Sequence, residues 1–125
     1  MTFTLAHIFS IIILHWFNDF VCQDESWATN KSKSNLALLK HTATYSMLWF
    51  PLAYFLGWLI IPFIIITFVT HTLTDYITSR LVSKKFANGE LGSSIPNFGA
   101  FTYIGFDQVI HYACLFGTFG YLMSI

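Results

Sequence analysis

Long apolar stretches alternate with short polar ones along this chain. Residues 1–22, 47–69 and 98–125 are strongly apolar, and residues 36–54 form a fourth, mixed stretch. Each is close to the ~20 residues with which a helix crosses the hydrocarbon core of a bilayer. The pattern therefore predicts four helices, over residues 2–21, 35–56, 58–86 and 98–123.

Polar and turn-forming residues set the ends of the predicted helices. Asp24 and Ser34 lie in the polar segment between the first two helices, and Gly57 lies between the second and the third. Pro96 precedes the fourth helix. Pro51 falls inside the second predicted helix, where we expect it to cause a kink.

The composition favours a membrane protein over a water-soluble domain. Of the 125 residues, 55% are hydrophobic and only 10% are charged, and the mean hydropathy is +0.61. Soluble domains carry about 25% charged residues. We therefore expect an all-α polytopic membrane protein with four transmembrane helices in an up-and-down bundle, forming a single domain over residues 1–125. The lipid bilayer is then its main partner.

The few charges exclude one class of partner and predict an orientation. Six basic and six acidic residues cancel, so no basic patch is large enough to bind a nucleic acid. The basic residues fall into two groups, Lys31, Lys33 and Lys40 followed by Arg80, Lys84 and Lys85. Because Lys and Arg concentrate on the cytoplasmic side of membrane proteins, we expect the polar connections at residues 24–35 and 87–96 in the cytoplasm and both termini outside.

Three of the four predicted helices carry a His and an Asp four residues apart. The pairs are His15 with Asp19, His71 with Asp75, and Asp107 with His111, and the remaining helix carries His41 near its start. A spacing of four places both side chains of a pair on one helix face. In an up-and-down bundle all seven groups fall at one depth near the cytoplasmic interface, because the first and third helices end where the second and fourth begin.

This polar constellation predicts a metal site. Imidazole and carboxylate groups are unfavourable inside a membrane, but together they are ligands of transition metals. Because seven groups exceed the four ligands of a closed zinc site, we expect one or two divalent ions, Zn²⁺ or else Mn²⁺ or Fe²⁺. The candidate ligands are His15, Asp19, His41, His71, Asp75, Asp107 and His111. The candidate catalytic residues are Asp19, Asp75 and Asp107, one of which would act as a base. The alternatives are a proton-titrating cluster and a network that only holds the helices together.

Other polar residues lie within one or two helical turns of these candidates. The residues placed to orient a ligand are Gln23, Tyr45, Ser79 and Cys114. A cysteine in a membrane helix is, however, more often a packing residue. Lys31, Lys33 and Arg80 would anchor lipid headgroups or bind a phosphate of the substrate. Gln108 is expected to face a neighbouring helix.

The same motifs carry a resemblance to a known family. His15-Trp16-x-x-Asp19-Phe20-x-x-Gln23, His71-x-x-x-Asp75-Tyr76 and Asp107-Gln108-x-x-His111 resemble an uncharacterised family of small bacterial and phage inner-membrane proteins, over nearly the whole chain. The resemblance implies the four-helix architecture and a place in the inner membrane of a bacterium or a phage-infected host, without naming a reaction. More distantly, the pattern is similar to membrane-bound proteins described as metal-dependent hydrolases.

Three functions are compatible with these observations. The first is metal-dependent hydrolysis of a lipid or a phosphate-bearing small substrate at the cytoplasmic interface. The second is a carrier or channel for divalent cations or protons. The apolar outer halves of the helices count against such a path in a monomer, although a homodimer could provide one. The third is a structural or regulatory membrane protein, for instance a phage protein that modifies its host membrane.

Overall fold

A computed structural model describes residues 2–91 and 99–125, which form helices and no strand. The longer helices are α1 (Leu5–Trp16), α3 (Asn35–Met47), α5 (Ile60–Ala87) and α6 (Ala100–Ser124). The shorter elements are a π-helix (Phe17–Val21), α2 (Glu25–Asn30), α4 (Ala53–Leu56) and two 3₁₀ turns (Phe50–Leu52 and Gly57–Leu59). The expected all-α class is confirmed.

Two of the predicted helices differ from the observed ones for local reasons. The first begins at Leu5 rather than at residue 2, because the backbone N–H of Thr4 donates to Nδ1 of His7 at 2.9 Å and fixes an extended residue there. The second is interrupted after Met47, and the chain continues through a 3₁₀ turn that contains Pro51. Proline lacks the N–H that would continue the α-helix, so the expected kink takes the form of a 3₁₀ turn within a longer helical run.

The other two predicted helices differ mainly at their starts. The chain turns at Gly57, which has a φ of 56°, and α5 begins at Ile60 rather than at residue 58. A φ of this sign favours glycine. The helix α6 begins at Ala100. Pro96 and the predicted start at residue 98 lie outside the described residues.

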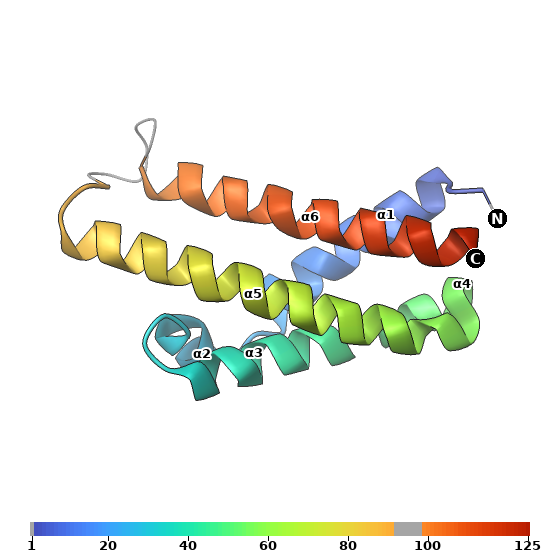
Figure 1. Cartoon of the computed structure of the whole chain (residues 1–125), viewed down its shortest axis with the longest axis horizontal. Coiled ribbons are helices and arrows are strands. Elements are labelled where there is room, and N and C mark those ends of the chain that lie inside the picture. Colours follow the sequence, from blue (N-terminus) through green and yellow to red (C-terminus); the bar gives the residue numbers. More distant parts are fainter. Residues whose placement is uncertain (1, 92–98) are drawn as a thin grey trace.

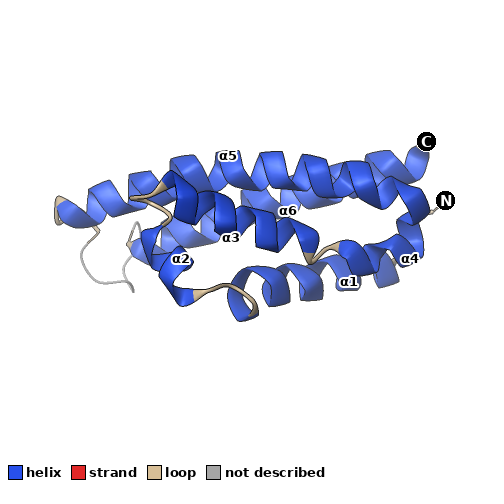
Figure 2. Cartoon of the chain, turned by 90° about the horizontal axis from the view of Figure 1, so that it is seen from below, coloured by secondary structure: helices blue, strands red, loops and turns tan. Residues whose placement is uncertain are grey.

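The helix α5 is the centre of the arrangement. It packs along α6 on one side and along α3 on the other. Figures 1 and 2 show α5 and α6 running antiparallel along the long axis of the molecule, with α1 crossing beside them. Both termini lie at one end of the molecule and α2 lies towards the other.

One helical run among the described residues is long and apolar enough to cross a membrane. It extends over Asn35–Ala87, and 28% of its most apolar window is buried within the protein. Leu5–Val21 is a shorter apolar run. Helix length and composition therefore identify one candidate span rather than the four that the sequence predicts.

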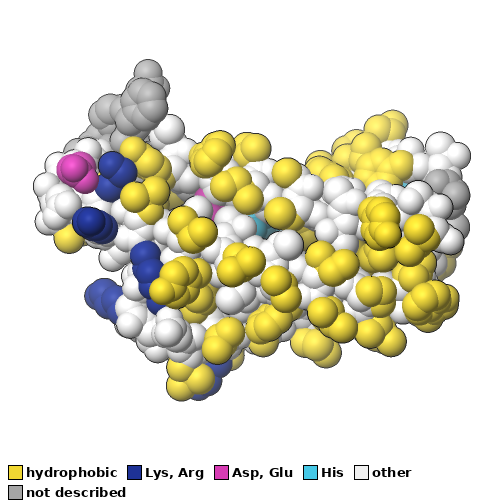
Figure 3. Space-filling view, viewed as in Figure 1, with side chains coloured by type: hydrophobic (Ala, Val, Ile, Leu, Met, Phe, Trp, Pro, Cys, Tyr) yellow, Lys and Arg dark blue, Asp and Glu magenta, His cyan; other side chains and the backbone are white. Residues whose placement is uncertain are grey.

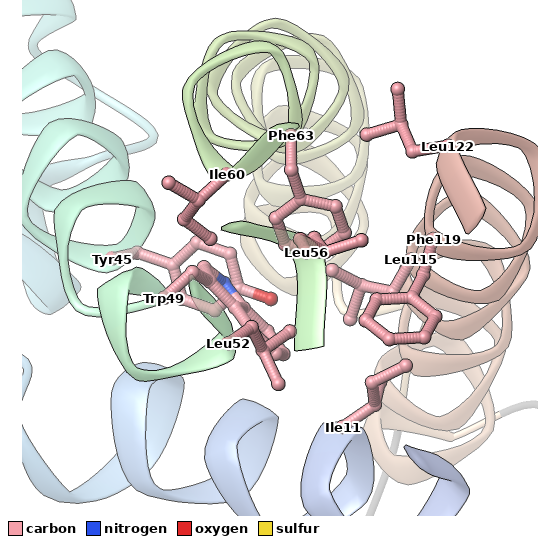
Figure 4. Packing of buried hydrophobic residues seen from close by; sticks show 10 residues of the cluster. All are labelled: Ile11, Tyr45, Trp49, Leu52, Leu56, Ile60, Phe63, Leu115, Phe119 and Leu122. Atoms are coloured by element: carbon pink, nitrogen blue, oxygen red, sulfur yellow. The ribbon is translucent and has the colours of Figure 1, made fainter. Parts of the chain in front are cut away.

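The end of the bundle near the termini is filled by an apolar cluster (Figure 4). Its members are Ile11, Tyr45, Trp49, Leu52, Leu56, Ile60, Phe63, Leu115, Phe119 and Leu122. The rings of Phe63 and Phe119 meet edge to face, with 6.1 Å between their centroids. This apolar cluster joins α1, α3, α4, α5 and α6. Polar residues lie further along the helices, towards the other end of the bundle.

Candidate metal centre

The seven predicted ligands converge in the interior of the bundle. We call them the His/Asp centre. The helix α1 and its π-helical extension supply His15 and Asp19, α3 supplies His41, α5 supplies His71 and Asp75, and α6 supplies Asp107 and His111. Six of them are at most 6% exposed, and Asp107 is partly buried. In Figure 3 a carboxylate and a histidine ring show at the base of the furrow between α5 and α6.

The carboxylate of Asp75 connects most of the centre. Its Oδ2 lies 3.3 Å from Nε2 of His41 and 3.5 Å from Nε2 of His71. Its Oδ1 lies 3.1 Å from Nε2 of His111. Because the side chain is 1% exposed, each of these contacts is made away from water.

Three sets of ligand atoms are close enough to share a metal ion. They are Asp19 with His71 and His111, His41 with His71 and Asp75, and Asp75 with Asp107 and His111. In the second set the two Nε2 atoms are 3.3 Å apart, so they form a small triangle with Oδ2 of Asp75. Six of the seven predicted ligands thus belong to at least one set.

Asp19 reaches the centre from a π-helix. The N–H of Cys22 donates to the carbonyl of Phe17 at 2.9 Å, which widens this turn relative to an α-helix. Asn18 and Asp19 are both buried as a result. Oδ1 of Asp19 lies 3.2 Å from Nε2 of His41 and 3.7 Å from Nε2 of His71.

His15 has a different place from the other predicted ligands. Its Nε2–H donates to Oε1 of Gln108 at 2.6 Å, and the hydroxyl of Tyr45 donates to its Nδ1 at 2.7 Å. Both ring nitrogens are therefore engaged, and His15 belongs to none of the three sets formed by the described residues. The amide Nε2 of Gln108 in turn donates to Oδ2 of Asp107 at 3.1 Å. His15 thus orients Asp107 through Gln108.

Asp107 is held between two helices. Its Oδ1 accepts a hydrogen bond of 2.6 Å from the hydroxyl of Thr78 on α5. Its Oδ2 lies 3.1 Å from Nε2 of His111, one turn along α6. Thr78 and Gln108 therefore belong to the polar centre. Gln108 was expected only to face a neighbouring helix, and Thr78 stands out in the sequence by no motif.

Lys31 also reaches the centre. Its ammonium donates to Oδ2 of Asp75 at 2.8 Å, and its side chain is 24% exposed. Burial opposes the charged form, but the charge of Asp75, the hydrogen bond to it and the charges of Asp19 and Asp107 outweigh burial and hold the pKa of Lys31 above its usual value. Lys31 is therefore a fixed positive charge beside the carboxylates.

The remaining predicted site residues are more peripheral. Arg80 donates to Oδ1 of Asn35 at 2.6 Å and stacks on Tyr76, and Lys33 is exposed. Cys114 is a partly buried free thiol. The residues expected to orient ligands are Gln23, Tyr45 and Ser79. Of these, Tyr45 contacts His15, whereas Gln23 and Ser79 line a pocket beside the centre.

Comparison with known proteins assigns a family. The chain matches the family DUF3307, described as a protein of unknown function, over residues 7–123. The chain belongs to this family. The membership confirms the expected uncharacterised family, and its description names no motif, membrane or reaction. No curated protein and no solved structure matches the chain.

Proposed function

We propose that the chain is a four-helix protein of the inner membrane of a bacterium or a phage-infected host. The spans would be α1 with its π-helix, α3 with α4, α5, and α6. Large apolar side chains face outwards along these helices, among them Ile13 at 61%, Ile65 at 58% and Val109 at 61% exposure. Hydrophobic groups cover much of the face in Figure 3. An apolar surface this extensive favours a bilayer as its surroundings.

The proposed orientation places the end with α2 in the cytoplasm and both termini outside. Lys and Arg side chains gather at that end in Figure 3, close to α2 and the last turns of α5. A concentration of positive charge at one end favours the cytoplasmic side. The His/Asp centre would then open towards the cytoplasm.

We infer that the His/Asp centre binds a divalent metal ion. The observation that carries this inference is the triangle of His41 Nε2, His71 Nε2 and Asp75 Oδ2, whose sides measure 3.3, 3.3 and 3.5 Å. Ligand atoms about 2.0–2.1 Å from a tetrahedral zinc ion lie about 3.3 Å apart. Two imidazoles and one carboxylate with a free fourth position form the type of ligand set found in catalytic zinc sites.

The charges of the centre also favour a divalent cation. Asp19, Asp75 and Asp107 bring three carboxylates together, and Lys31 supplies one ammonium. When the histidines are neutral, as metal ligands must be, two negative charges lack a counter-charge inside the bundle. Because uncompensated buried charge is strongly unfavourable, one divalent ion would balance the group. Asp107, His111 and Oδ1 of Asp75 adjoin the triangle and would accept a second ion.

The proposed reaction is hydrolysis of a lipid or a phosphate-bearing small substrate. A bound divalent ion would polarise the ester and lower the pKa of water. Asp19 lies beside the triangle and also lines the adjacent pocket. We therefore assign it the role of the base that takes a proton from water at Oδ1. Asp75 would be a ligand of the ion in the triangle, and Asp107 would hold the second ion together with His111.

The apolar cluster favours hydrolysis over transport. It fills the bundle between the His/Asp centre and the end that carries the termini. A carrier or channel needs polar groups or water along its path. The packed rings of Phe63 and Phe119 stand in that path.

The direct test is turnover by metal-loaded protein in lipid nanodiscs. Wild-type protein loaded with Zn²⁺ or Mn²⁺ should hydrolyse phosphate esters. Asp19→Asn should keep its metal and lose turnover, whereas His71→Ala should lose both. Metal-dependent turnover that survives Asp19→Asn would contradict the assigned base. Reconstituted vesicles that pass Zn²⁺ or protons in a manner dependent on Asp75 would replace hydrolysis by the carrier function.

A further inference from the structure

A pocket of about 430 Å³ lies beside the His/Asp centre, between the π-helix, α2, α5 and α6. Its inner end reaches the centre, because Asp19, Lys31 and Asp107 line it. Its volume is at the small end of the range for ligand pockets, about 300–1,000 Å³. The pocket therefore offers a small molecule direct access to the proposed metal site.

The two ends of this pocket differ in polarity. Ser79 of α5 lines it at the level of the centre, and Val82 and Phe86 follow along the same helix. Phe86 lies seven positions after Ser79, which corresponds to about 10 Å along the helix. Ile104 on α6 and Leu91 after α5 complete the apolar end. A ligand that fits both ends is amphipathic, with its polar group next to the His/Asp centre.

Ser79 indicates what the polar group is. Its hydroxyl oxygen is buried and has no hydrogen-bond partner among the described residues, although most buried polar atoms have one. Ser79 and Lys31 both line the pocket. A hydroxyl donor beside a fixed positive charge matches the oxygens of a phosphate. The carboxylates of Asp19 and Asp107 would repel a phosphate until a divalent ion balances them.

We propose that this pocket binds a single-chain phosphate ester, with its phosphate at Lys31 and Ser79 and its hydrocarbon chain beside Val82 and Phe86. The inference rests on the proposed function, which supplies the balancing ion. The apolar end of the pocket lies on the side of the charged connections, so the ligand points its head towards the middle of the bundle. A lipid in the cytoplasmic leaflet has the opposite orientation. The ligand therefore enters as a free amphiphile and not as a bilayer lipid.

Binding to metal-loaded protein in phosphatidylcholine nanodiscs tests this inference. Dodecyl phosphate should bind saturably, at least ~10-fold more tightly than inorganic phosphate, because two buried methylene groups are enough for that ratio. It should also bind more tightly than dodecanol, which lacks the phosphate. Phosphatidic acid within the nanodisc should not compete. Equal binding of inorganic phosphate, or displacement by phosphatidic acid, would overturn the proposal.

Matched variants locate the ligand. Val82→Phe should fill the apolar end and weaken dodecyl phosphate binding at least ~10-fold, about two methylene groups of lost contact. Val69→Phe, on an exposed part of the same helix, should leave binding unchanged. Ser79→Ala should weaken binding of dodecyl phosphate, whereas Thr74→Val, which alters a hydroxyl bonded to the carbonyl of Thr70, should not. Wild-type affinity in Val82→Phe would overturn the proposal.

Elemental analysis separates this proposal from the proposed function. Protein that holds its metal but does not bind dodecyl phosphate would overturn the pocket assignment and leave the metal site in place. Protein that binds dodecyl phosphate in a Val82-dependent manner but takes up no divalent ion would support the pocket assignment. It would contradict both the metal site and the need for an ion to balance Asp19 and Asp107.

Discussion

The end of the bundle near the chain termini packs Phe63 against Phe119, whereas the other end stacks His71 on His111, although α5 and α6 supply both pairs. On each helix the two residues are eight positions apart, so they share one face. The apolar pair gains stability from packing alone. The stacked histidines lie among three carboxylates and the ammonium of Lys31. We therefore propose that the first end holds the fold and that the second binds a ligand.

Asp75→Ala should produce the largest effect, because Asp75 joins most of the polar end. It would leave the ammonium of Lys31 without its partner and remove a proposed metal ligand. We expect a loss of ~3–5 kcal/mol in the free energy of unfolding and loss of bound metal, measured by denaturation in detergent and elemental analysis.

Asp24→Ala is the matched control for this change. Asp24 is exposed and caps α2 by accepting from the N–H of Trp27, so its loss should cost ~1 kcal/mol. If both variants lost the same free energy of unfolding, the contacts of Asp75 would contribute no more to stability than a cap on the protein surface.

Phe119→Ala tests whether the apolar end stabilises the fold independently of the metal site. Phe119 is fully buried in the apolar cluster, and the cavity should cost ~3 kcal/mol. Metal content should not change. Phe106→Ala on the exposed face of α6 should stay within ~0.5 kcal/mol of wild type. Loss of metal in Phe119→Ala would show that the two ends are not separate.

Tyr45→Phe should have a smaller effect, because it removes one hydrogen bond to His15. We expect ~1 kcal/mol of destabilisation and unchanged metal content. Tyr121→Phe, at an exposed position, should be neutral by the same unfolding measurement. If Tyr45→Phe lost its metal as Asp75→Ala is expected to, His15 would be a ligand rather than an orienting residue.

Lys31→Met breaks the ion pair with Asp75 from its cationic side, and its effect should depend on pH. The pKa of Lys31 is raised in the folded protein, so its contribution to stability is fully present below the ordinary lysine pKa of ~10.4 and is lost as pH rises through the raised value. The difference in unfolding free energy between wild type and Lys31→Met should therefore shrink in that alkaline range. Lys33→Met, at an exposed position, should show no such trend.

The sequence predicts the helices and the convergence of the His/Asp centre because both depend on simple periodicities. Apolar stretches of helix length indicate the helices, and a spacing of four places His71 and Asp75 on one face. The exact helix ends are less predictable, since Pro51 could either kink a helix or end it.

Other features of the centre depend on tertiary contacts and have no local signal. The π-helix at Phe17–Val21 buries Asp19 without a distinctive motif. Gln108 joins the centre only because α6 packs beside α1 and brings it to His15. Lys31 belongs to a polar segment in which lysines ordinarily mark topology, and the position of α2 turns it towards Asp75.

The metal content of purified protein tests the central claim most directly. Elemental analysis after equilibration with Zn²⁺ and removal of free ions should find one or two ions per chain in wild type. The same content is expected in His7→Ala, because His7 packs on Phe55 and Phe119 at the apolar end. His71→Ala should lower the metal affinity more than ~100-fold, since changes to residues that only orient a ligand already lower it ~10–100-fold. Wild-type protein without stoichiometric metal, or His71→Ala with full metal content, would contradict the account.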